Sequence, residues 1–194
     1  MAGSRDFWEG RYRAAAGSGT SLWGAAPNGW VAERAEGLEP GHAIDLGAGE
    51  GRNARWLVQR GWSVEALDFS PAAVEGMRAD GLDARVADAT AFTAGRPADL
   101  AVLCYLQLQP DDLAAAIGAA ARALAPGGVL LGIWHDREDV ERGLAGAMDP
   151  RIRTTPDETE EAARAAGLRI ELSGRRDRSV EAGLACDCLL VARA

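Results

Sequence analysis

A glycine-rich turn is the feature of this sequence that most restricts its fold. The apolar run HAIDLG (42–47) leads into Gly47-Ala48-Gly49-Glu50-Gly51, and residues 52–60 follow with apolar side chains at mostly helical spacing. Glycine permits a tight turn and lets a ligand approach the backbone without an intervening side chain. The free N–H groups of a following helix then face that ligand. The pattern predicts a strand, a ligand-binding turn and a helix, which together open an α/β sheet.

The same alternation continues to the end of the chain. Strands are predicted over 62–70, 84–88, 99–108 and 127–135, and helices from Pro71, over Asp111–Leu124 and over Pro156–Ala166. The last two predicted strands, 168–174 and 183–194, have no helix between them, so we expect a hairpin. We therefore predict an α/β fold: a Rossmann-like, doubly wound sheet of seven strands, mostly parallel with an antiparallel last strand.

The first 40 residues differ from the rest because they are rich in aromatic side chains. Helices are predicted over Arg5–Ala16 and Pro27–Glu36, with a glycine- and serine-rich loop between them. No linker divides the chain, so we expect a single domain over residues 1–194, consisting of an N-terminal segment (1–40) and a core (41–194).

Composition excludes several classes of function. The chain has no lysine, so all 21 basic residues are arginine, which excludes a P-loop ATPase and a Schiff-base enzyme. Its formal charge of −8 disfavours a nucleic-acid partner. Three cysteines are too few for a disulfide framework, and no run is apolar enough for secretion or a membrane span. We expect a cytoplasmic monomer or homodimer with no membrane partner.

Three acidic residues stand at the ends of successive predicted strands. Asp45 precedes the glycine turn, Asp68 follows 23 residues later, and Asp88 follows 20 residues after that. An acid in the position of Asp68 can accept both ribose hydroxyls of a nucleoside, although it could instead cap the helix that begins after Ser70. A dinucleotide turn would carry its third glycine at position 52, where this chain has Arg52. An NAD(P)-dependent oxidoreductase is therefore the alternative rather than the preferred interpretation.

The pattern D-x-G-x-G-x-G over Asp45–Gly51, together with Asp68, Asp88 and the LAPGG turn, resembles class I S-adenosylmethionine-dependent methyltransferases. The segments GEGRN (49–53), DFSP (68–71) and WGAAPNGW (23–30) are similar to those of small bacterial tellurite-resistance and thiopurine methyltransferases. The resemblance implies S-adenosylmethionine as cofactor, S-adenosylhomocysteine as product and a small-molecule acceptor. The chain departs from the family pattern at Ala48, a position where cysteine is frequent in the family. A protein that binds the cofactor without methylating is a further alternative.

The resemblance also assigns cofactor contacts. Asp45 would lie near the cofactor's ammonium group, Asp68 would accept the ribose hydroxyls, and Asp88 would accept the adenine amino group. The N-terminal segment of the relatives folds over the cofactor, so Tyr12 and Trp23 are candidates for a lid. The expected cofactor-binding residues are Tyr12, Trp23, Asp45, Gly47, Ala48, Gly49, Asn53, Asp68, Phe69, Ser70, Asp88, Ala89 and Cys104.

Candidates at the acceptor side are few. In-line methyl transfer requires alignment and exclusion of water, and a hydroxyl or protonated amine also requires a base, whereas a thiolate does not. Tyr105, near the end of the predicted strand 99–108, and His135, at the end of the predicted strand 127–135, are the predicted catalytic residues. Tyr105 could instead be a buried strand aromatic, and His135 a loop or capping residue. His42 begins a strand, at the opposite end from the ligands, and is expected to be structural.

Other polar groups are assigned structural roles. No group of His, Cys and Asp has metal-ligand spacing, so no metal is expected. The basic run Arg175–Arg178 is placed in the turn between the last two strands, as a solvated surface rather than a grip for an anionic acceptor. Short connections are expected after the strands 99–108 and 127–135, which leaves no room for a domain that recognises a macromolecule.

Overall fold

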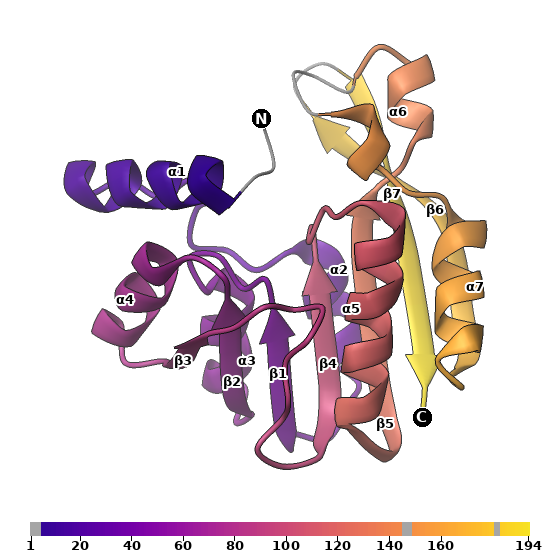
Figure 1. Cartoon of the computed structure of the whole chain (residues 1–194), viewed down its shortest axis with the longest axis horizontal. Helices are drawn as coiled ribbons and strands as arrows, with labels where there is room; N and C mark the ends of the chain where they lie inside the picture. Colours follow the sequence, from indigo (N-terminus) through magenta and orange to yellow (C-terminus); the bar gives the residue numbers. More distant parts are fainter. Residues whose placement is uncertain (1–4, 145–148, 181–182) are drawn as a thin grey trace.

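The computed structural model describes residues 5–144, 149–180 and 183–194. Within them, seven strands form one mixed sheet in the order β3-β2-β1-β4-β5-β7-β6 (Figure 1). The first five strands along the chain are parallel, and β7 lies antiparallel between β5 and β6. The strands are β1 (His42–Leu46), β2 (Ser63–Asp68), β3 (Asp83–Val86), β4 (Ala98–Cys104), β5 (Leu124–His135), β6 (Arg169–Val180) and β7 (Gly183–Arg193). The predicted fold class is confirmed.

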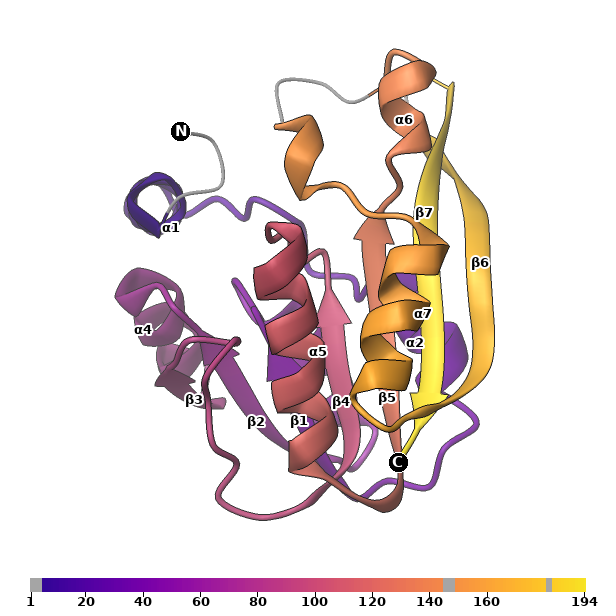
Figure 2. The ribbon, with the colours of Figure 1, turned by 45° about the vertical axis from the view of Figure 1, so that its right-hand side comes forward.

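Helices cover both faces of the sheet, as a doubly wound fold requires. One face packs against α5 (Pro110–Ala123) and α7 (Pro156–Ala165), which lie side by side in front of the strands (Figure 2). The other face packs against α2 (Gly29–Ala35), α3 (Arg52–Gln59) and α4 (Pro71–Ala79). Side chains alternate between the two cores along each strand: Ile44 and Leu46 join the first, and Ala43 joins the second. Asp45 shares the face of Ala43 and therefore points toward α3.

The order of strands reverses between β1 and β4. The chain runs outward from β1 through β2 to β3, then returns to β4 on the other side of β1. The loops after β1 and β4 therefore diverge at this point and leave a crevice at the carboxyl ends of the strands, where ligands bind in open α/β sheets. Above this edge lies α1 (Arg5–Ser18), which contacts α4 (Figure 1).

Several predicted boundaries shift, and two of the shifts change the site. The strand predicted to reach residue 108 ends at Cys104, so Tyr105 lies just beyond it, and it is the one non-glycine residue of the described chain with a positive φ (55°). The helix predicted from Pro27 begins at Gly29, because the Asn28 side chain accepts the N–H groups of Trp30 and Val31 as the N-cap.

The closing hairpin is longer than predicted, and this corrects the placement of the basic run. Arg175–Arg178 lie inside β6, paired with β7, rather than in a turn. The connection after β5 is also longer than expected, because it carries the short α6 (Glu138–Glu141) and a 3-10 turn at Pro150–Ile152 before α7. In the described part of the chain, no helix combines the length and apolar character that crossing a bilayer demands.

Candidate functional site

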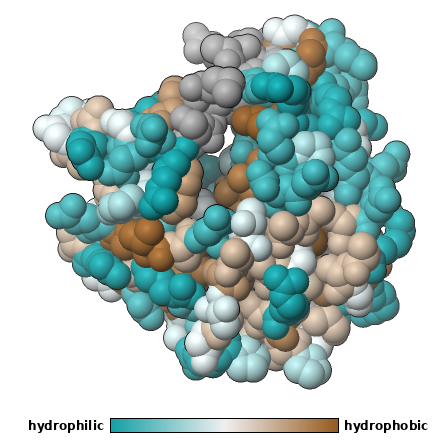
Figure 3. All heavy atoms as spheres, viewed as in Figure 1, coloured by the Kyte–Doolittle hydropathy of each residue, from teal (hydrophilic) through white to brown (hydrophobic). Residues whose placement is uncertain are grey.

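Two adjoining cavities lie at the carboxyl ends of β1, β2 and β4. The face of the molecule drawn in Figure 3 is hollowed between α1 and the upper part of the closing hairpin. The smaller cavity, of about 200 Å³, is lined by Gly47, Asp68, Phe69, Ala87, Asp88, Ala89, Thr90, Leu106, Leu108 and Asp112. The larger, of about 290 Å³, is lined by Trp8, Tyr12, Trp23, Gly47, Ala48, Gly49, Arg52, Asn53, Asp68, Phe69, Cys104, Tyr105, Leu106, Gln107, His135 and Arg178. The two share four residues, among them Gly47 and Asp68, so they form one continuous site.

The glycine turn separates the sheet from this site and is held by the carboxylate of Asp68. Gly49 N–H donates to Asp68 Oδ2 over 2.8 Å, and Ser70 N–H donates to Oδ1 over 2.9 Å. Burial raises the pKa of Asp68, against the opposing effect of these N–H groups. Each oxygen has a second lone pair, so the carboxylate can still accept hydrogen bonds from a ligand.

Asp45 lies behind the glycine turn and lines neither cavity. Its side chain is fully buried, and neither carboxylate oxygen has a hydrogen-bond partner among the described residues that meets normal geometry. Burial raises the pKa of Asp45 to about 7, and the nearby Ala54 backbone N–H opposes this only partly. A buried carboxylate without partners is costly, so this position favours a cation nearby.

Asp88 stands at the open end of the smaller cavity, where β3 has ended. Its Oδ1 accepts the Thr90 N–H over 2.8 Å and the Thr90 hydroxyl over 2.7 Å, and these hydrogen bonds lower the pKa of Asp88. No described residue donates a hydrogen bond to its second oxygen. Asp88, Ala89 and Phe69 therefore supply a carboxylate, a backbone segment and an aromatic ring at one cavity.

The N-terminal segment forms the wall of the larger cavity opposite the sheet. Trp8 stacks on Tyr12 with a centroid separation of 5.9 Å and contacts Trp23 at 5.8 Å. The Arg11 guanidinium lies over both tryptophan rings, 5.3 and 5.7 Å from their centroids. We call Trp8, Tyr12 and Trp23 the aromatic wall.

Two carboxylates attach the aromatic wall to the core. Glu50, inside the glycine turn, accepts the Leu22 N–H over 2.9 Å and the Ser21 hydroxyl over 2.8 Å. Glu9 on α1 accepts the Ser70 hydroxyl and the Ala72 N–H at the start of α4. These hydrogen bonds lower the pKa of Glu9. The close approach of the aromatic wall to the glycine turn requires glycine at position 49, because a Cβ there would lie 2.8 Å from the Tyr12 hydroxyl.

A polar cluster forms the far side of the larger cavity. The Tyr105 and His135 rings stack with centroids 4.4 Å apart. Both contact Asp187 of β7, which is fully buried: the Tyr105 hydroxyl donates to it over 2.8 Å, and His135 Nδ1 lies 3.4 Å away. Arg178 of β6 donates to the same carboxylate over 2.9 Å. We call Tyr105, His135, Arg178 and Asp187 the acceptor-side cluster.

Charge in this cluster is balanced by Asp187. Burial alone would raise the pKa of Asp187, but His135, Arg178 and Tyr105 together hold it below its usual value. Burial and the neighbouring Asp187 raise the pKa of Tyr105, so its hydroxyl keeps its proton. Burial likewise raises the pKa of Cys104 to about 12.

Most of the predicted site residues meet at these cavities, and two do not line them. Asp45 lies behind the turn, and Ser70 is the N-cap of α4, where its hydroxyl accepts the Ala73 N–H. Asn53 lines the larger cavity, but its side-chain oxygen is used by the Asn28 N–H. His42 lies at the other end of the sheet with Nδ1 3.0 Å from the Ser63 carbonyl oxygen.

Five residues of the larger cavity were not predicted: Trp8, Arg52, Leu106, Gln107 and Arg178. Asp187 was also missed, although a lone acid in the apolar run Cys186–Val191 was a visible signal. Gln107, with its amide oriented to satisfy both neighbours, accepts the His135 N–H over 2.9 Å and donates to the Ile152 carbonyl over 2.8 Å. It therefore fixes the backbone of His135.

The structure also brings together Asp136, Glu138 and Cys186, which the sequence spacing did not suggest as metal ligands. Arg175 Nε lies 3.0 Å from both carboxylates, so a cation already occupies the space between them.

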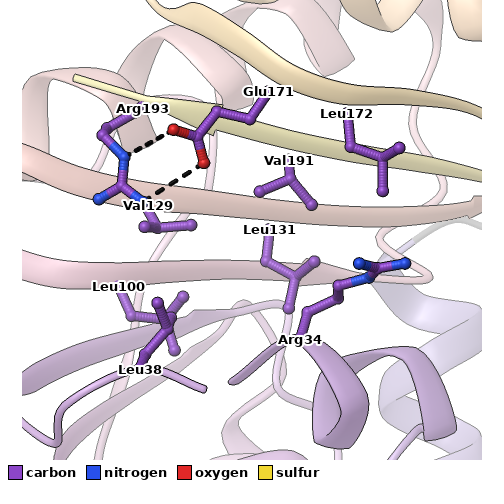
Figure 4. A pocket seen from close by; sticks show the side chains of 9 residues that line it. All are labelled: Arg34, Leu38, Leu100, Val129, Leu131, Glu171, Leu172, Val191 and Arg193. Atoms are coloured by element: carbon purple, nitrogen blue, oxygen red, sulfur yellow. Dashed lines mark hydrogen bonds and ion pairs between the residues drawn. The ribbon is translucent and has the colours of Figure 1, made fainter. Parts of the chain in front are cut away.

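A cavity of about 320 Å³ lies away from this site, on the sheet face that carries α2 (Figure 4). Its walls are mostly aliphatic side chains of β4, β5 and β7, and the ion pair between Arg193 and Glu171 closes one end. It carries no nucleophile or base near a positioned partner, so we do not assign chemistry to it.

Comparisons with known proteins agree with this geometry. Residues 43–128 match the family described as a methyltransferase domain. A search of curated proteins returned no match. Similar solved structures include a SAM-dependent methyltransferase from Methanosarcina mazei (15% identity, 83% of this chain and 96% of that chain, TM-score 0.72). A TehB-like SAM-dependent methyltransferase from Corynebacterium glutamicum is similar over 97% of this chain and 96% of that one (20% identity, TM-score 0.65).

A third similar structure is 1,6-didemethyltoxoflavin-N1-methyltransferase from Burkholderia thailandensis, solved with 1,6-didemethyltoxoflavin and S-adenosylhomocysteine bound. It is 20% identical over 95% of this chain and 86% of that chain, with a TM-score of 0.67. At these identities the likeness to the three structures is one of fold.

Proposed function

We propose that the chain is a class I S-adenosylmethionine-dependent methyltransferase and that it methylates a small-molecule acceptor held in the larger cavity. The observation that carries this proposal is the aromatic wall along one side of that cavity, which is attached to the core through Glu50 and Glu9. A cavity of about 290 Å³ behind such a wall suits a small molecule better than a macromolecular chain.

The residues present fit the cofactor. The ionisable carboxylate of Asp45 has no partner among the described residues, which suits an ammonium group directly or through water. Asp68 retains lone pairs for the ribose hydroxyls. We assign Asp88, Ala89 and Phe69 to the adenine ring, and Gly47–Gly49 to the methionine part, where glycine leaves the backbone open.

The remaining expected contacts belong to the same proposal. Tyr12 and Trp23 would close over the cofactor, and the Cys104 backbone carbonyl would face it. Asn53 and Ser70 would act through the structure they hold, since their side chains bond within the protein. Ala48 would contribute its small volume at the turn.

When bound, the cofactor supplies a methyl group activated by a positively charged sulfur. The task of the protein is to align an acceptor atom with that methyl group and to exclude water. The aromatic wall would perform the exclusion, and Tyr105 and His135, which face the same cavity, would contact the acceptor. We place this chemistry in the cytoplasm and assign no nucleic-acid, membrane or metal partner.

Ligand-dependent melting tests the proposal in two stages. S-adenosylhomocysteine should raise the melting temperature, while NAD and NADP should leave it unchanged, because a ligand stabilises the state that binds it. Stabilisation by NAD(P) alone would support the oxidoreductase interpretation instead. A panel of small acceptors is then incubated with S-adenosylmethionine and analysed by mass spectrometry. Binding of cofactor without methylation of any acceptor would favour a non-methylating cofactor-binding protein.

A further inference from the structure

Asp187 organises the acceptor-side cluster from a position outside the cavity. It is the direct cross-strand partner of His135 in the β5–β7 ladder, and its carboxylate also holds Tyr105 and Arg178. The Asp187 side chain is fully buried, whereas the His135 side chain is 21% exposed and lines the cavity. Asp187 therefore acts on the cavity only through its neighbours.

The contact with Asp187 determines which His135 nitrogen can accept a proton. Nδ1 lies 3.4 Å from Asp187 Oδ1, and an ionised carboxylate only accepts hydrogen bonds. The proton of the neutral ring therefore belongs on Nδ1, since an unprotonated Nδ1 would place two acceptors against each other. Nε2, on the other side of the ring, then keeps its lone pair, and no described residue donates a hydrogen bond to it.

Other groups of the larger cavity are poor bases at neutral pH. Tyr105 and Tyr12 keep their protons because burial raises the pKa of both hydroxyls. Cys104 is a thiol for the same reason, and Asp68 is engaged by two backbone N–H groups at the glycine turn. Arg52 and Arg178 are always protonated. In its neutral form, His135 offers this cavity a lone pair at Nε2 that no described residue occupies.

On the basis of the function proposed above, we propose that His135 Nε2 is the general base and that Asp187 is its positioning residue. The acceptor then carries its nucleophile as an O–H or N–H group. The acceptor's lone pair forms the new bond to carbon, the carbon–sulfur electron pair stays on sulfur, and the acceptor's proton passes to Nε2. The ionised Asp187 stabilises the resulting imidazolium, as a carboxylate does in other base–orienter pairs. A thiolate acceptor would need no such pair.

The tautomer of His135 tests the arrangement without any reaction. The chain has two histidines, so nitrogen-15 NMR of the cofactor-free protein gives two imidazole systems, and His42→Gln assigns them. We expect the proton of neutral His135 on Nδ1 in the wild-type protein, and a mixture of tautomers or Nε2–H in Asp187→Asn. A wild-type ring protonated on Nε2 would overturn the proposal even if Asp187→Asn failed to fold.

Matched acceptors test the base itself. Phenol and aniline are each compared with thiophenol, by the S-adenosylhomocysteine formed with wild-type protein and His135→Gln. Turnover of the O–H and N–H members should fall about 100-fold or more, the usual contribution of a general base, while any thiol turnover should change less than about threefold. Ser179→Ala, an exposed change in the same hairpin, serves as control and should stay within about twofold of wild type.

Outcomes separate this inference from the function on which it rests. Equal loss for thiols and hydroxyls, or retention of O–H and N–H turnover in His135→Gln, overturns the base and leaves the small-molecule function standing. If S-adenosylhomocysteine binds but neither pair is methylated by the wild-type protein, the function itself is contradicted for these acceptors, and the base with it.

Discussion

The Gly49 N–H donates to Asp68 Oδ2 over 2.8 Å, so the loop after β1 is fixed by a residue from the end of β2. The same carboxylate also accepts the Ser70 N–H at the start of α4. One side chain therefore joins a glycine turn, a neighbouring strand and a helix start, while presenting itself to both cavities. Asp68 can therefore contact a ligand and also hold the start of α4, so the two alternative roles predicted for it are compatible.

Replacing Asp68 tests its ligand role. In Asp68→Ala we expect the affinity for S-adenosylhomocysteine to fall at least about tenfold, because a charged hydrogen-bonding group contributes about 1.5–3 kcal/mol. Isothermal titration calorimetry measures the change. Asp83→Ala, at an exposed carboxylate on β3, is the matched control and should bind as wild type. Unchanged affinity in Asp68→Ala would place the nucleoside elsewhere.

Asp45 should make folding stability depend on pH. Its folded-state pKa is about 7, above the ordinary value of 3.8, so the folded protein binds more protons than the unfolded chain between these values. The contribution of the neutral Asp45 carboxyl to the free energy of unfolding is therefore complete below about pH 4. It is lost as the pH rises toward 7. In Asp45→Asn the cofactor-free protein should be more stable than wild type at pH 8, by an amount on the order of 4 kcal/mol.

Urea denaturation at pH 5 and pH 8 measures this effect, with Asp83→Asn as control. S-adenosylhomocysteine should bind wild type more tightly as the pH rises through 7, since an ammonium favours ionised Asp45, and this dependence should disappear in Asp45→Asn. Equal stability of wild type and Asp45→Asn at pH 8 would contradict the prediction.

Glu50 should control how firmly the aromatic wall is held. In Glu50→Gln the charged hydrogen bonds to the Leu22 N–H and the Ser21 hydroxyl are weakened. Amide hydrogen exchange across residues 20–24 should then become about tenfold faster, as expected for a loss of about 1.4 kcal/mol of local protection. Exchange detected by mass spectrometry measures it. Glu75→Gln, an exposed change on α4, should leave the segment unaffected; equal exchange in both variants would mean that Glu9 alone holds the wall.

Gly132 should be intolerant of a side chain. A Cβ at this position of β5 would overlap the ring of Trp134, which is fully buried. Gly132→Ala should lower the free energy of unfolding by about 1–3 kcal/mol, the usual cost of overpacking. Gly76→Ala, in open space on α4, should instead raise it by about 0.5–1 kcal/mol, because alanine favours helix. Thermal or chemical denaturation compares the two, and similar effects would contradict this packing.

The gathering of the residues proposed for the cofactor at one edge of the sheet was predictable, because the sequence signals for it are local. Asp45 lies near the end of β1, Asp68 ends β2 and Asp88 comes two residues after β3, and parallel strands bring their carboxyl ends to one edge of the sheet. Glycines at 47 and 49 have positive φ values of 68° and 57°, a conformation that the sequence pattern anticipates. Only the full burial of Asp45 behind the glycine turn, on the sheet face that carries α3, required the structure.

The acceptor side was less predictable because it depends on pairing between distant strands. Arg178 reaches the cavity only because β6 continues past residue 174 and pairs with β7. Asp187 meets His135 through the register of β5 and β7, which no local pattern specifies. Trp8 lines the cavity because carboxylates far along the chain hold the N-terminal segment in place.

The strand reversal between β1 and β4 separates the residues assigned to the cofactor from residues assigned to the acceptor. Residues 43–128, which match the methyltransferase family, contain the glycine turn and the three acids assigned to the cofactor. His135, Arg178 and Asp187 all come later, on the strands added beyond β4. Substitutions in the closing hairpin are therefore expected to change which compound receives the methyl group, while the supply of that group stays the same. New specificities can arise at one edge of the sheet without a loss of the shared chemistry at its centre.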